Sequence, residues 1–292
     1  MPGTATSMKV STTIAETKSA VAMARAEGAR IGFVPTMGAL HAGHISLVDR
    51  SRREADYTVM SIFVNPLQFA PTEDLSRYPR PVAEDERLAS EAGVDLVFRP
   101  DVDEMYRRDR TVMVTAGKLG SLWEGKSRPG HFDGVLTVVA KLFNIVDPDI
   151  AIFGQKDLQQ AALVTAMVAD LNMPLGIIVS PIVRETDGLA LSSRNRYLSP
   201  EERVRATALN RALRTIRSQF DAGERRVEVL ERAGKETVTR ESGVDLDYLA
   251  VIDRATFENP DVAQSGNSAI IAARVGTTRL IDNMTLGRDD QD

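Results

Sequence analysis

The feature that most constrains the fold of this chain is an apolar segment, Ile31 to Val34, followed directly by the loop PTMGALHAGH, which carries two of the three histidines. If the segment is a strand and a helix begins near Gly43, the loop passes over the carboxyl end of a parallel sheet, where open α/β sheets bind ligands. The helix N-terminus then presents backbone N–H groups and positive partial charge to an anion. His41 and His44 face one side of the first turn. We therefore expect a nucleotide site here.

The same loop contains Gly38 and Gly43, which let the backbone approach a bound ligand closely. With the preceding strand they favour a nucleotide site over the alternative, a pair of helix-capping or partly buried histidines without a ligand. We expect hydrogen bonds from the imidazoles to phosphate oxygens. Protonated imidazoles would also offset the charge that develops on an attacked phosphate.

A second segment far along the chain has the composition of a phosphate-binding loop. Residues 187–196, DGLALSSRNR, combine a flexible turn with two hydroxyls and two guanidiniums. Hydroxyls and backbone N–H groups bind phosphate oxygens, and arginine neutralises charge in the transition state. The segment suits a mobile loop that closes over a polyphosphate, and an ordinary polar surface turn is the alternative.

Apolar runs alternate with helical stretches up to about Val183, which is typical of a parallel sheet with crossover helices. We expect strands at 31–34, 58–64, 95–98, 150–154 and 175–179, and helices at 45–55, 83–92, 134–146 and 158–170. Beyond that point we expect helices at 200–218 and 227–240, then strands at 246–252, 268–273 and 278–281. The prediction is an α/β fold: a Rossmann-like parallel-sheet domain over 1–182 and a smaller C-terminal α+β domain over 183–292. No GxGxxG fingerprint is present, which argues against a dehydrogenase.

The charge balance excludes several classes of protein. The 292 residues carry 36 basic and 41 acidic side chains, a net charge of -5, whereas a protein that binds nucleic acid would more often be basic. No apolar segment reaches transmembrane length and the opening MPGTATSMKV lacks the apolar centre of a signal peptide, so we expect a cytoplasmic protein without a membrane partner. Zero cysteines exclude disulfides, thiolate catalysis and cysteine-ligated metals.

The two phosphate-binding segments also carry a signature. MGALHAGH resembles the HxGH motif of the nucleotidyltransferase superfamily, and LSSRN resembles the KMSKS-type second phosphate loop of the same superfamily. Further segments, in chain order, are SIFVNPLQF from Ser61, YPR from Tyr78, RPGHF from Arg128 and FGQKDLQQ from Phe153. From about Ile31 to Asn283, this colinear set closely resembles the pantothenate synthetases, or pantoate–β-alanine ligases.

The resemblance implies a two-step ligation that uses ATP. The carboxylate of (R)-pantoate attacks the α-phosphate of ATP, which releases pyrophosphate and leaves pantoyl adenylate. The amine of β-alanine then attacks this mixed anhydride and releases AMP and pantothenate, and water must be kept from the adenylate. Mg²⁺ is implied because ATP is used as its magnesium complex and a hard cation takes oxygen ligands. The family also implies a homodimer.

Site residues follow by matching positions. The implied catalytic residues are His44, matched to the proton donor, with His41, Lys156 and Arg194; electrostatic stabilisation of phosphates is the physical role expected of the histidines. Residues matched to ATP contacts are Met37, Gly38, Ala39, Leu40, His41, His44, Gly154, Gln155, Lys156, Asp157, Val183, Leu191, Ser192, Ser193 and Arg194. Gln68, Gln160 and His131 are matched to the substrate pocket, and Asp85, beside Glu84, to a metal ligand near the triphosphate. The smaller domain is expected to cover the ATP site.

Each assignment has a structural alternative. Lys156 is alternatively a surface lysine after a strand, and Gln68 and Gln160 are alternatively satisfied buried amides. His131 is alternatively a packed, hydrogen-bonded histidine. Asp85 is alternatively part of a solvated first helical turn, where the helix dipole favours acids.

The sequence departs from the family pattern at three positions. Leu191 and Leu67 stand where methionine is common, and both keep apolar bulk. Gln155 stands where glutamate commonly precedes the lysine, which removes a charge beside Lys156.

Three other functions share part of the pattern. A cytidylyl- or adenylyltransferase would share both phosphate loops but would leave the segments from Phe63 to Phe69 and from Tyr78 to Arg80 unexplained. A fragment of an aminoacyl-tRNA synthetase should bring a basic anticodon-binding region, and none is evident. A non-catalytic regulator would bind ATP without turnover.

Overall fold

The computed structural model describes residues 8–71 and 73–287, and the chain forms two compact units. The first unit comprises Met1–Ser121, Gly125–Phe153 and Leu163–Ser180, and the second comprises Leu122–Glu124, Gly154–Ala162 and Pro181–Asp292. The expected division into domains 1–182 and 183–292 stays a prediction. The second compact unit also takes in two short segments, 122–124 and 154–162, that precede this division in the sequence.

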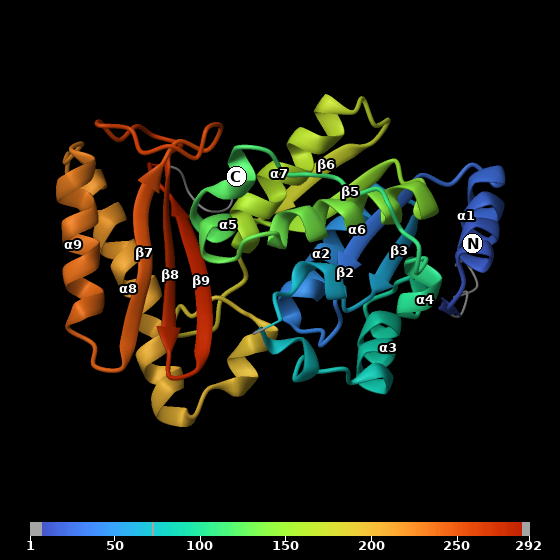
Figure 1. Ribbon diagram of the computed structural model, residues 1–292, viewed down its shortest axis with the longest axis horizontal. Coiled ribbons are helices and arrows are strands. Elements are labelled where there is room, and N and C mark those ends of the chain that lie inside the picture. The colour runs from blue at the N-terminus through green and yellow to red at the C-terminus, as the bar shows by residue number, and fades with distance from the viewer. Residues whose placement is uncertain (1–7, 72, 288–292) are drawn as a thin grey trace. The chain divides into compact units, whose positions relative to one another are not determined.

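The first unit is built on a six-stranded parallel sheet in the order β1-β4-β3-β2-β5-β6 (Figure 1). Its strands are β1 (Lys9–Ser11), β2 (Ile31–Thr36), β3 (Tyr57–Ile62), β4 (Leu96–Phe98), β5 (Ile150–Gly154) and β6 (Gly176–Ser180). β2 lies inside the sheet, between β3 and β5. A strand covered by helices on both faces is apolar throughout rather than alternating, which explains the continuous apolar run of β2.

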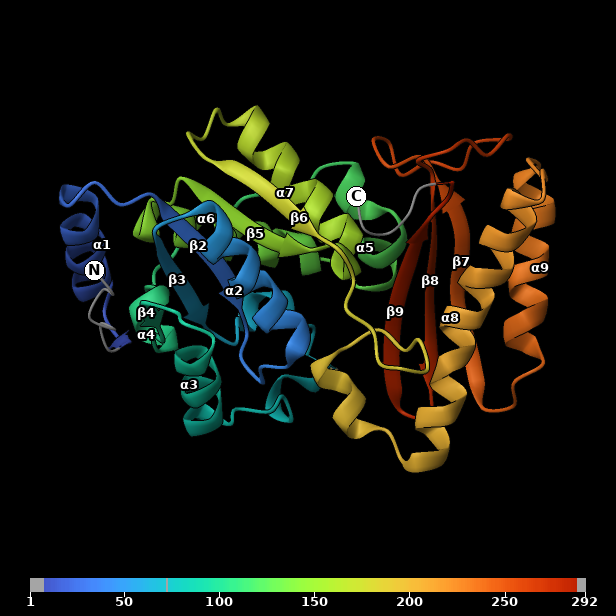
Figure 2. The same ribbon diagram turned by 180° about the vertical axis from the view of Figure 1, so that it is seen from behind.

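Helices cover both faces of this sheet. α2 (Ala42–Glu54) and α3 (Val82–Glu91) lie on the face turned toward the viewer in Figure 2, and α6 (His131–Val146) lies on the face seen in Figure 1. The other helices in the described chain before residue 171 are α1 (Ile14–Ala26), α4 (Val102–Met105), α5 (Trp123–Ser127) and α7 (Leu158–Asp170).

Neighbouring residues of β2 reach these two helical layers. Val34 is fully buried in a cluster with Leu47 and Val48 of α2. The ring of Phe33 instead meets Phe143 of α6 edge-on, with centroids 6.3 Å apart. β2 is therefore anchored on both sides, and its carboxyl end is a rigid base for the loop that follows.

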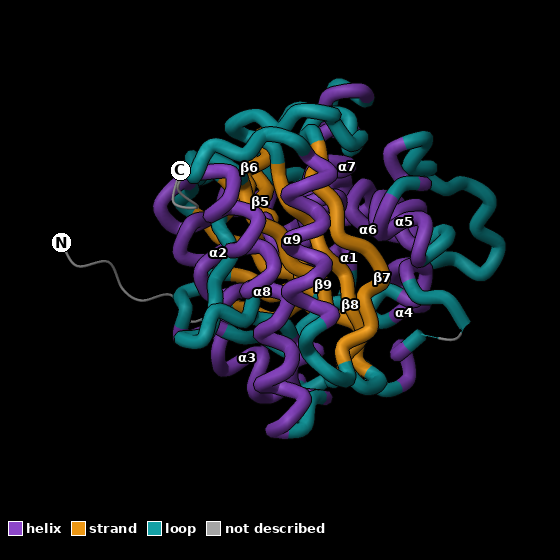
Figure 3. Tube along the Cα trace, turned by 90° about the vertical axis from the view of Figure 1, so that its left-hand side faces the viewer, coloured by secondary structure: helices purple, strands orange, loops and turns teal. Residues whose placement is uncertain are grey.

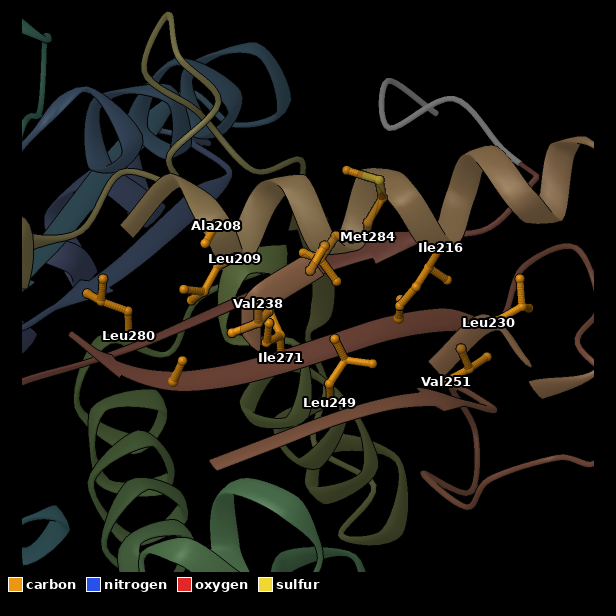
Figure 4. Packing of buried hydrophobic residues seen from close by; sticks show 14 of the residues in the cluster. Ala208, Leu209, Ile216, Leu230, Val238, Leu249, Val251, Ile271, Leu280 and Met284 are labelled. Carbon is orange, nitrogen blue, oxygen red and sulfur yellow. The ribbon is translucent and has the colours of Figure 1, made fainter. Parts of the chain in front are cut away.

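The second unit has a three-stranded antiparallel sheet, β7 (Val244–Ile252), β8 (Ser268–Val275) and β9 (Thr278–Thr285), covered on one face by α8 (Pro200–Asp221) and α9 (Val227–Thr239) (Figure 3). α8 begins at Pro200 after Ser199, whose hydroxyl accepts the Glu202 N–H, a standard N-terminal cap. The buried core of this unit includes Leu209 and Ile216 of α8 and the strand residues shown with them in Figure 4.

The fold class predicted from the sequence is confirmed, with differences at the level of elements. α2 begins at Ala42, so His41 is its cap rather than a loop residue. β1, α1, α4 and α5 were not predicted, because β1, α4 and α5 have only three to five residues and α1 lacks a clear apolar stripe. Within residues 8–71 and 73–287, no helix combines the length and apolar character needed to cross a membrane.

Candidate active site

The loop between β2 and α2 makes a tight turn at the end of the strand. The hydroxyl of Thr36 accepts the Gly38 N–H (3.2 Å) and donates to the carbonyl oxygen of Ser61 on β3 (2.7 Å). The chain then passes through two residues with positive φ, Gly38 at 79° and Ala39 at 51°. This conformation is easy for glycine and costly for alanine, so neighbouring structure must hold Ala39 in place.

Asp85 of α3 supplies that restraint. Its Oδ2 accepts the Ala39 N–H (2.9 Å) and its Oδ1 accepts the Leu40 N–H (2.7 Å), and the residue is only 1% exposed. A Cβ added at Gly38 would lie 2.8 Å from Oδ2, so the carboxylate packs directly on the turn. The ATP contacts predicted for Ala39 and Leu40 must therefore use atoms other than these N–H groups. The buried position of Asp85 also differs from the solvated helical turn considered as its alternative.

The expected role of Asp85 as a metal ligand stays a prediction. Both of its oxygens already accept backbone N–H groups of the loop, so a bound cation would have to use the remaining lone pairs of this carboxylate. In the part of the chain that the structure describes, no group of three or more His, Cys, Asp or Glu side chains is arranged to hold a metal ion.

His41 and His44 lie together on the first turn of α2, with ring centroids 4.1 Å apart and planes tilted by 39°. Nδ1 of His41 accepts the Gly43 N–H (3.1 Å), and Nδ1 of His44 accepts the His41 N–H (3.3 Å). A ring nitrogen that accepts a backbone N–H carries no proton, so this network assigns both rings the neutral tautomer with an Nε2–H donor. The protonated form considered from the sequence does not match this geometry. Capping uses Nδ1 of each ring, whereas donation to a phosphate would use Nε2–H, so the two roles are compatible.

Gln68 ends the short 3₁₀ helix η1 (Pro66–Gln68) and is buried beside this loop. Its Oε1 accepts from Asn65 Nδ2 (3.0 Å), and its Nε2 donates to the Met37 sulfur (3.1 Å). Asn65 also donates to the Gly134 carbonyl oxygen (3.1 Å) and accepts the Tyr106 hydroxyl (2.8 Å), which fixes the orientation of the amide pair. A thioether is a weak acceptor, so a substrate oxygen would be a stronger partner for the Gln68 amide.

His131, at the start of α6, supports Gln68 from behind. Its Nδ1 lies 2.8 Å from the Gln68 carbonyl oxygen, which only accepts, so Nδ1 carries the proton. Its Nε2 then accepts from Arg128 (3.0 Å), and Arg128 forms a two-point ion pair with Glu73 (2.7 and 2.8 Å). Burial opposes ionisation of Glu73, but the hydrogen bonds and charge of Arg128 outweigh it and lower the Glu73 pKa. His131 thus has the packed, hydrogen-bonded environment of its structural alternative, and direct substrate contact stays a prediction.

In the second unit, Lys156 lies in the 3₁₀ turn η4 (Gln155–Asp157) that follows β5. Its Nζ lies 3.8 Å from Asp157 Oδ1, a loose ion pair, and its side chain is 20% exposed. Nδ2 of Asn283 donates to the carbonyl oxygens of Gln155 (2.9 Å) and Lys156 (3.0 Å). The Gln155 amide donates back to Asn283 Oδ1 (3.3 Å). An ionised glutamate at position 155 has no N–H to donate. Gln155, which departs from the family pattern, therefore makes a hydrogen bond that the usual glutamate could not make.

The segment that resembles the second phosphate loop is an ordered turn. Leu191 N–H donates to the Val183 carbonyl (3.0 Å), so two predicted ATP contacts lie opposite each other. Ser192 caps the 3₁₀ helix η5 (Ser193–Tyr197), its hydroxyl accepting the Arg194 N–H (3.2 Å). At the tip of the turn Asp187 forms a two-point ion pair with Arg203 of α8 (2.7 and 3.1 Å), and these hydrogen bonds lower the Asp187 pKa.

Each unit gathers one set of the predicted site residues. The first unit holds Met37, Gly38, Ala39, Leu40, His41, His44, Gln68, Asp85 and His131, and the second holds Gly154, Gln155, Lys156, Asp157, Gln160, Val183, Leu191, Ser192, Ser193 and Arg194. Gln160 lies in the first turn of α7, after Gln159, which is buried and donates to the Leu122 carbonyl (2.9 Å).

Two residues with structural roles beside the site were not predicted. Asn65 and Asn283 are 1% and 2% exposed and orient Gln68 and the Lys156 turn, respectively. Both were visible in the sequence as polar residues within or just after an apolar run, SIFVN and LIDNM. A buried amide must find hydrogen-bond partners, and that requirement was the available signal.

Comparison with known proteins decides the family. Residues 9–285 match the family described as pantoate-beta-alanine ligase. The chain belongs to this family. A pantothenate synthetase from Caldicellulosiruptor saccharolyticus is 51% identical over 273 residues, which cover 94% of this chain and 97% of the relative. The resemblance read from the motifs, and the assignment as an enzyme, are thereby confirmed.

Solved ligases of the family have the same fold. The pantothenate synthetase from Thermus thermophilus aligns with a TM-score of 0.91 at 47% identity, covering 95% of this chain and 99% of that one. The pantoate-beta-alanine ligase from Francisella tularensis, solved in complex with beta-gamma ATP and beta-alanine, aligns with a TM-score of 0.79 at 33% identity, covering 97% and 100%. Family membership therefore rests on sequence and fold over nearly the whole chain.

Proposed function

We propose that this chain joins (R)-pantoate to β-alanine with ATP, through enzyme-bound pantoyl adenylate, as an AMP-forming ligase. In the first step a pantoate carboxylate oxygen bonds to the α-phosphorus of ATP, and the bond to the bridging oxygen breaks to release pyrophosphate. In the second step the β-alanine amine bonds to the acyl carbon, AMP leaves with the electron pair, and the amine loses a proton. Membership of the pantoate-beta-alanine ligase family and the Francisella complex support ATP and β-alanine as ligands.

His41 and His44 are the proposed phosphate donors of the first step. The observation that carries this assignment is the pair of adjacent imidazoles at the N-terminus of α2, in each of which Nδ1 accepts a backbone N–H and Nε2–H is a donor. Neutral donors at a helix N-terminus stabilise negative charge on a phosphate without adding a second cation to a crowded ring pair. We propose that Lys156 and Arg194 supply the cationic charge as pyrophosphate departs.

Pantoate is proposed to bind at Gln68 and Gln160, with His131 in the same pocket. An amide donates and accepts at once, which matches a substrate with both hydroxyl and carboxylate groups. The support on the first unit is the fixed orientation of the Gln68 amide, whose N–H group has only a thioether as its described partner. His131 is proposed to contribute by holding the Gln68 backbone.

The remaining assignments are part of the same proposal. ATP is proposed to contact Met37, Gly38, Ala39, Leu40, Gly154, Gln155, Asp157, Val183, Leu191, Ser192 and Ser193 as well as the catalytic residues, with the 183–292 region covering the nucleotide. Mg²⁺ is proposed to enter as the magnesium complex of ATP, so its charge belongs to the substrate. We also propose a cytoplasmic homodimer.

Product analysis tests this function. Incubation of the chain with MgATP, (R)-pantoate and β-alanine should yield AMP, pyrophosphate and pantothenate in equal amounts. ADP and phosphate in place of AMP and pyrophosphate would indicate an acyl-phosphate route and contradict the proposal.

A further inference from the structure

Strand β9 carries two adjacent buried polar residues, Asp282 and Asn283, between the apolar residues Ile281 and Met284. In the β8 pairing Asp282 lies opposite Ile271 and Asn283 opposite Ile270. Because successive side chains of a strand point to opposite faces, Asp282 shares the helix-covered face with Ile271, a core residue, and Asn283 lies on the other face. Two consecutive residues of β9 therefore place polar side chains on opposite faces of the sheet.

On its own face, Asn283 holds the turn that presents Lys156. Both Nδ2 hydrogens are used, one on the carbonyl of Gln155 (2.9 Å) and one on that of Lys156 (3.0 Å). The Gln155 amide donates to Asn283 Oδ1, which fixes the amide with its N–H groups toward the turn. Asn283 is 2% exposed, so loss of its donors would leave two carbonyls in a buried environment without these bonds.

On the opposite face, Asp282 holds the segment that leads into the second phosphate loop. Arg184 donates twice to its carboxylate (2.7 and 3.0 Å), and also to the carbonyl oxygens of Gly188 (3.1 Å) and Asn283 (3.1 Å). Burial raises the pKa of Asp282, and the charges of Arg184 and Lys156 oppose that rise.

We propose that Asn283 is a positioning residue for adenylate formation: it fixes the backbone of the turn from which Lys156 reaches ATP, while Asp282 fixes the second phosphate loop from the same strand through Arg184. The proposal rests on the role assigned to Lys156 above. It adds that the Lys156 turn and the second phosphate loop are both held in place by residues of β9.

The test substitutes Asn283→Asp, which keeps the shape of the side chain but replaces both donors by a carboxylate facing two carbonyl oxygens. We expect the maximal rate of pantoate-dependent ATP–pyrophosphate exchange to fall about 10²-fold, the scale of a small misplacement of a catalytic group. The KM for pantoate should change by less than about 3-fold, because the described side-chain bonds of Asn283 go to the 155–156 turn and not to a residue assigned to pantoate. Asn283→Ser, which retains one hydroxyl donor, should give an intermediate rate. This variant replaces Asn283→Asp in the test if the aspartate variant does not fold.

A double-mutant cycle separates positioning from general destabilisation. In a Lys156→Ala background the Asn283 substitution should cost less than about 3-fold, because the group it positions is already absent. Leu280→Ala, on the helix-facing side of β9, is the matched control: it should lower the melting temperature and leave the exchange rate near that of the unsubstituted chain.

Three outcomes would overturn the proposal. An equal loss from the Asn283 substitution in both backgrounds would show that it acts independently of Lys156. An exchange rate unchanged in both Asn283 variants would show that the anchor is not needed. Full exchange by Lys156→Ala alone would refute the proposed function of Lys156, and this inference with it. That outcome is distinguishable from a failure of the positioning role alone, because it is seen without any substitution at Asn283.

Discussion

The carboxylate of Asp85 accepts the backbone N–H of Leu40 at 2.7 Å, with its second oxygen on the neighbouring N–H of Ala39 at 2.9 Å. A residue of α3 therefore fixes the turn that leads into His41. The turn includes a non-glycine residue with positive φ, a conformation that persists only when the surroundings hold it. The placement of the histidines thus depends on a buried acid that lies far from them in the sequence.

Substitution of Asp85 by asparagine should disturb this turn. An amide offers one acceptor oxygen and places an N–H donor against a backbone N–H, which costs about 1–3 kcal/mol for the lost buried bond. We expect slower adenylate formation, with the concentration of Mg²⁺ that gives half-maximal rate unchanged. The measurement is a Mg²⁺ titration of pyrophosphate exchange at fixed ATP. A selective rise in the Mg²⁺ requirement would instead support Asp85 as a metal ligand.

Removal of the His44 side chain should abolish most of the first step. His44→Ala deletes one Nε2–H donor and the acceptor for the His41 N–H, and we expect adenylate formation to fall by about 10²–10⁴-fold. Circular dichroism should show an intact fold. Asp49→Ala, at an exposed position of the same helix, is the matched control and should keep its rate. Normal turnover by the His44 variant would refute the assigned role.

Gln68→Leu should act mainly on pantoate. The substitution removes the amide that Asn65 orients, and loss of such a bond costs about 1–3 kcal/mol, or about 10- to 100-fold in affinity. We expect a higher pantoate KM and little change in the ATP KM, measured by steady-state kinetics with each substrate varied in turn. Leu67→Met, which restores the residue common in the family, should be nearly neutral. Equal effects on both substrates would argue against a pantoate contact.

The Glu73–Arg128 pair should make the first unit sensitive to acid. The folded-state pKa of Glu73 lies below its ordinary value of 4.5, so the pair contributes stability above that pH and loses it as pH falls through the lowered value. We expect Glu73→Gln to reduce the free energy of unfolding by about 1 kcal/mol at pH 7. Denaturant titrations of both chains should show this gap closing below about pH 4.5. A gap that stays constant down to pH 3 would contradict the assignment.

The sequence predicted best those features that depend on local pattern. Buried strands such as β2 read as apolar runs, and the alternation of such runs with helical stretches indicated the element types and the fold class. The loop after β2 was placed correctly because its position depends on the strand and helix that flank it.

Long-range polar contacts could not be predicted from the sequence. Nothing in the spacing of Asp85 and Leu40, or of Asn283 and Lys156, shows that one side chain accepts or donates to the other's backbone. These bonds depend on the strand order, which brings β9 beside η4 and α3 beside the end of β2. The tautomers of His41 and His44 likewise follow from backbone geometry at the cap, which no residue pattern specifies.

The most direct test of the central claim is ATP–pyrophosphate exchange measured with pantoate present and β-alanine absent. Exchange that requires pantoate and no amine, followed by AMP release when β-alanine is added, is the result that adenylate formation predicts. Binding of ATP without exchange under the same conditions would contradict it.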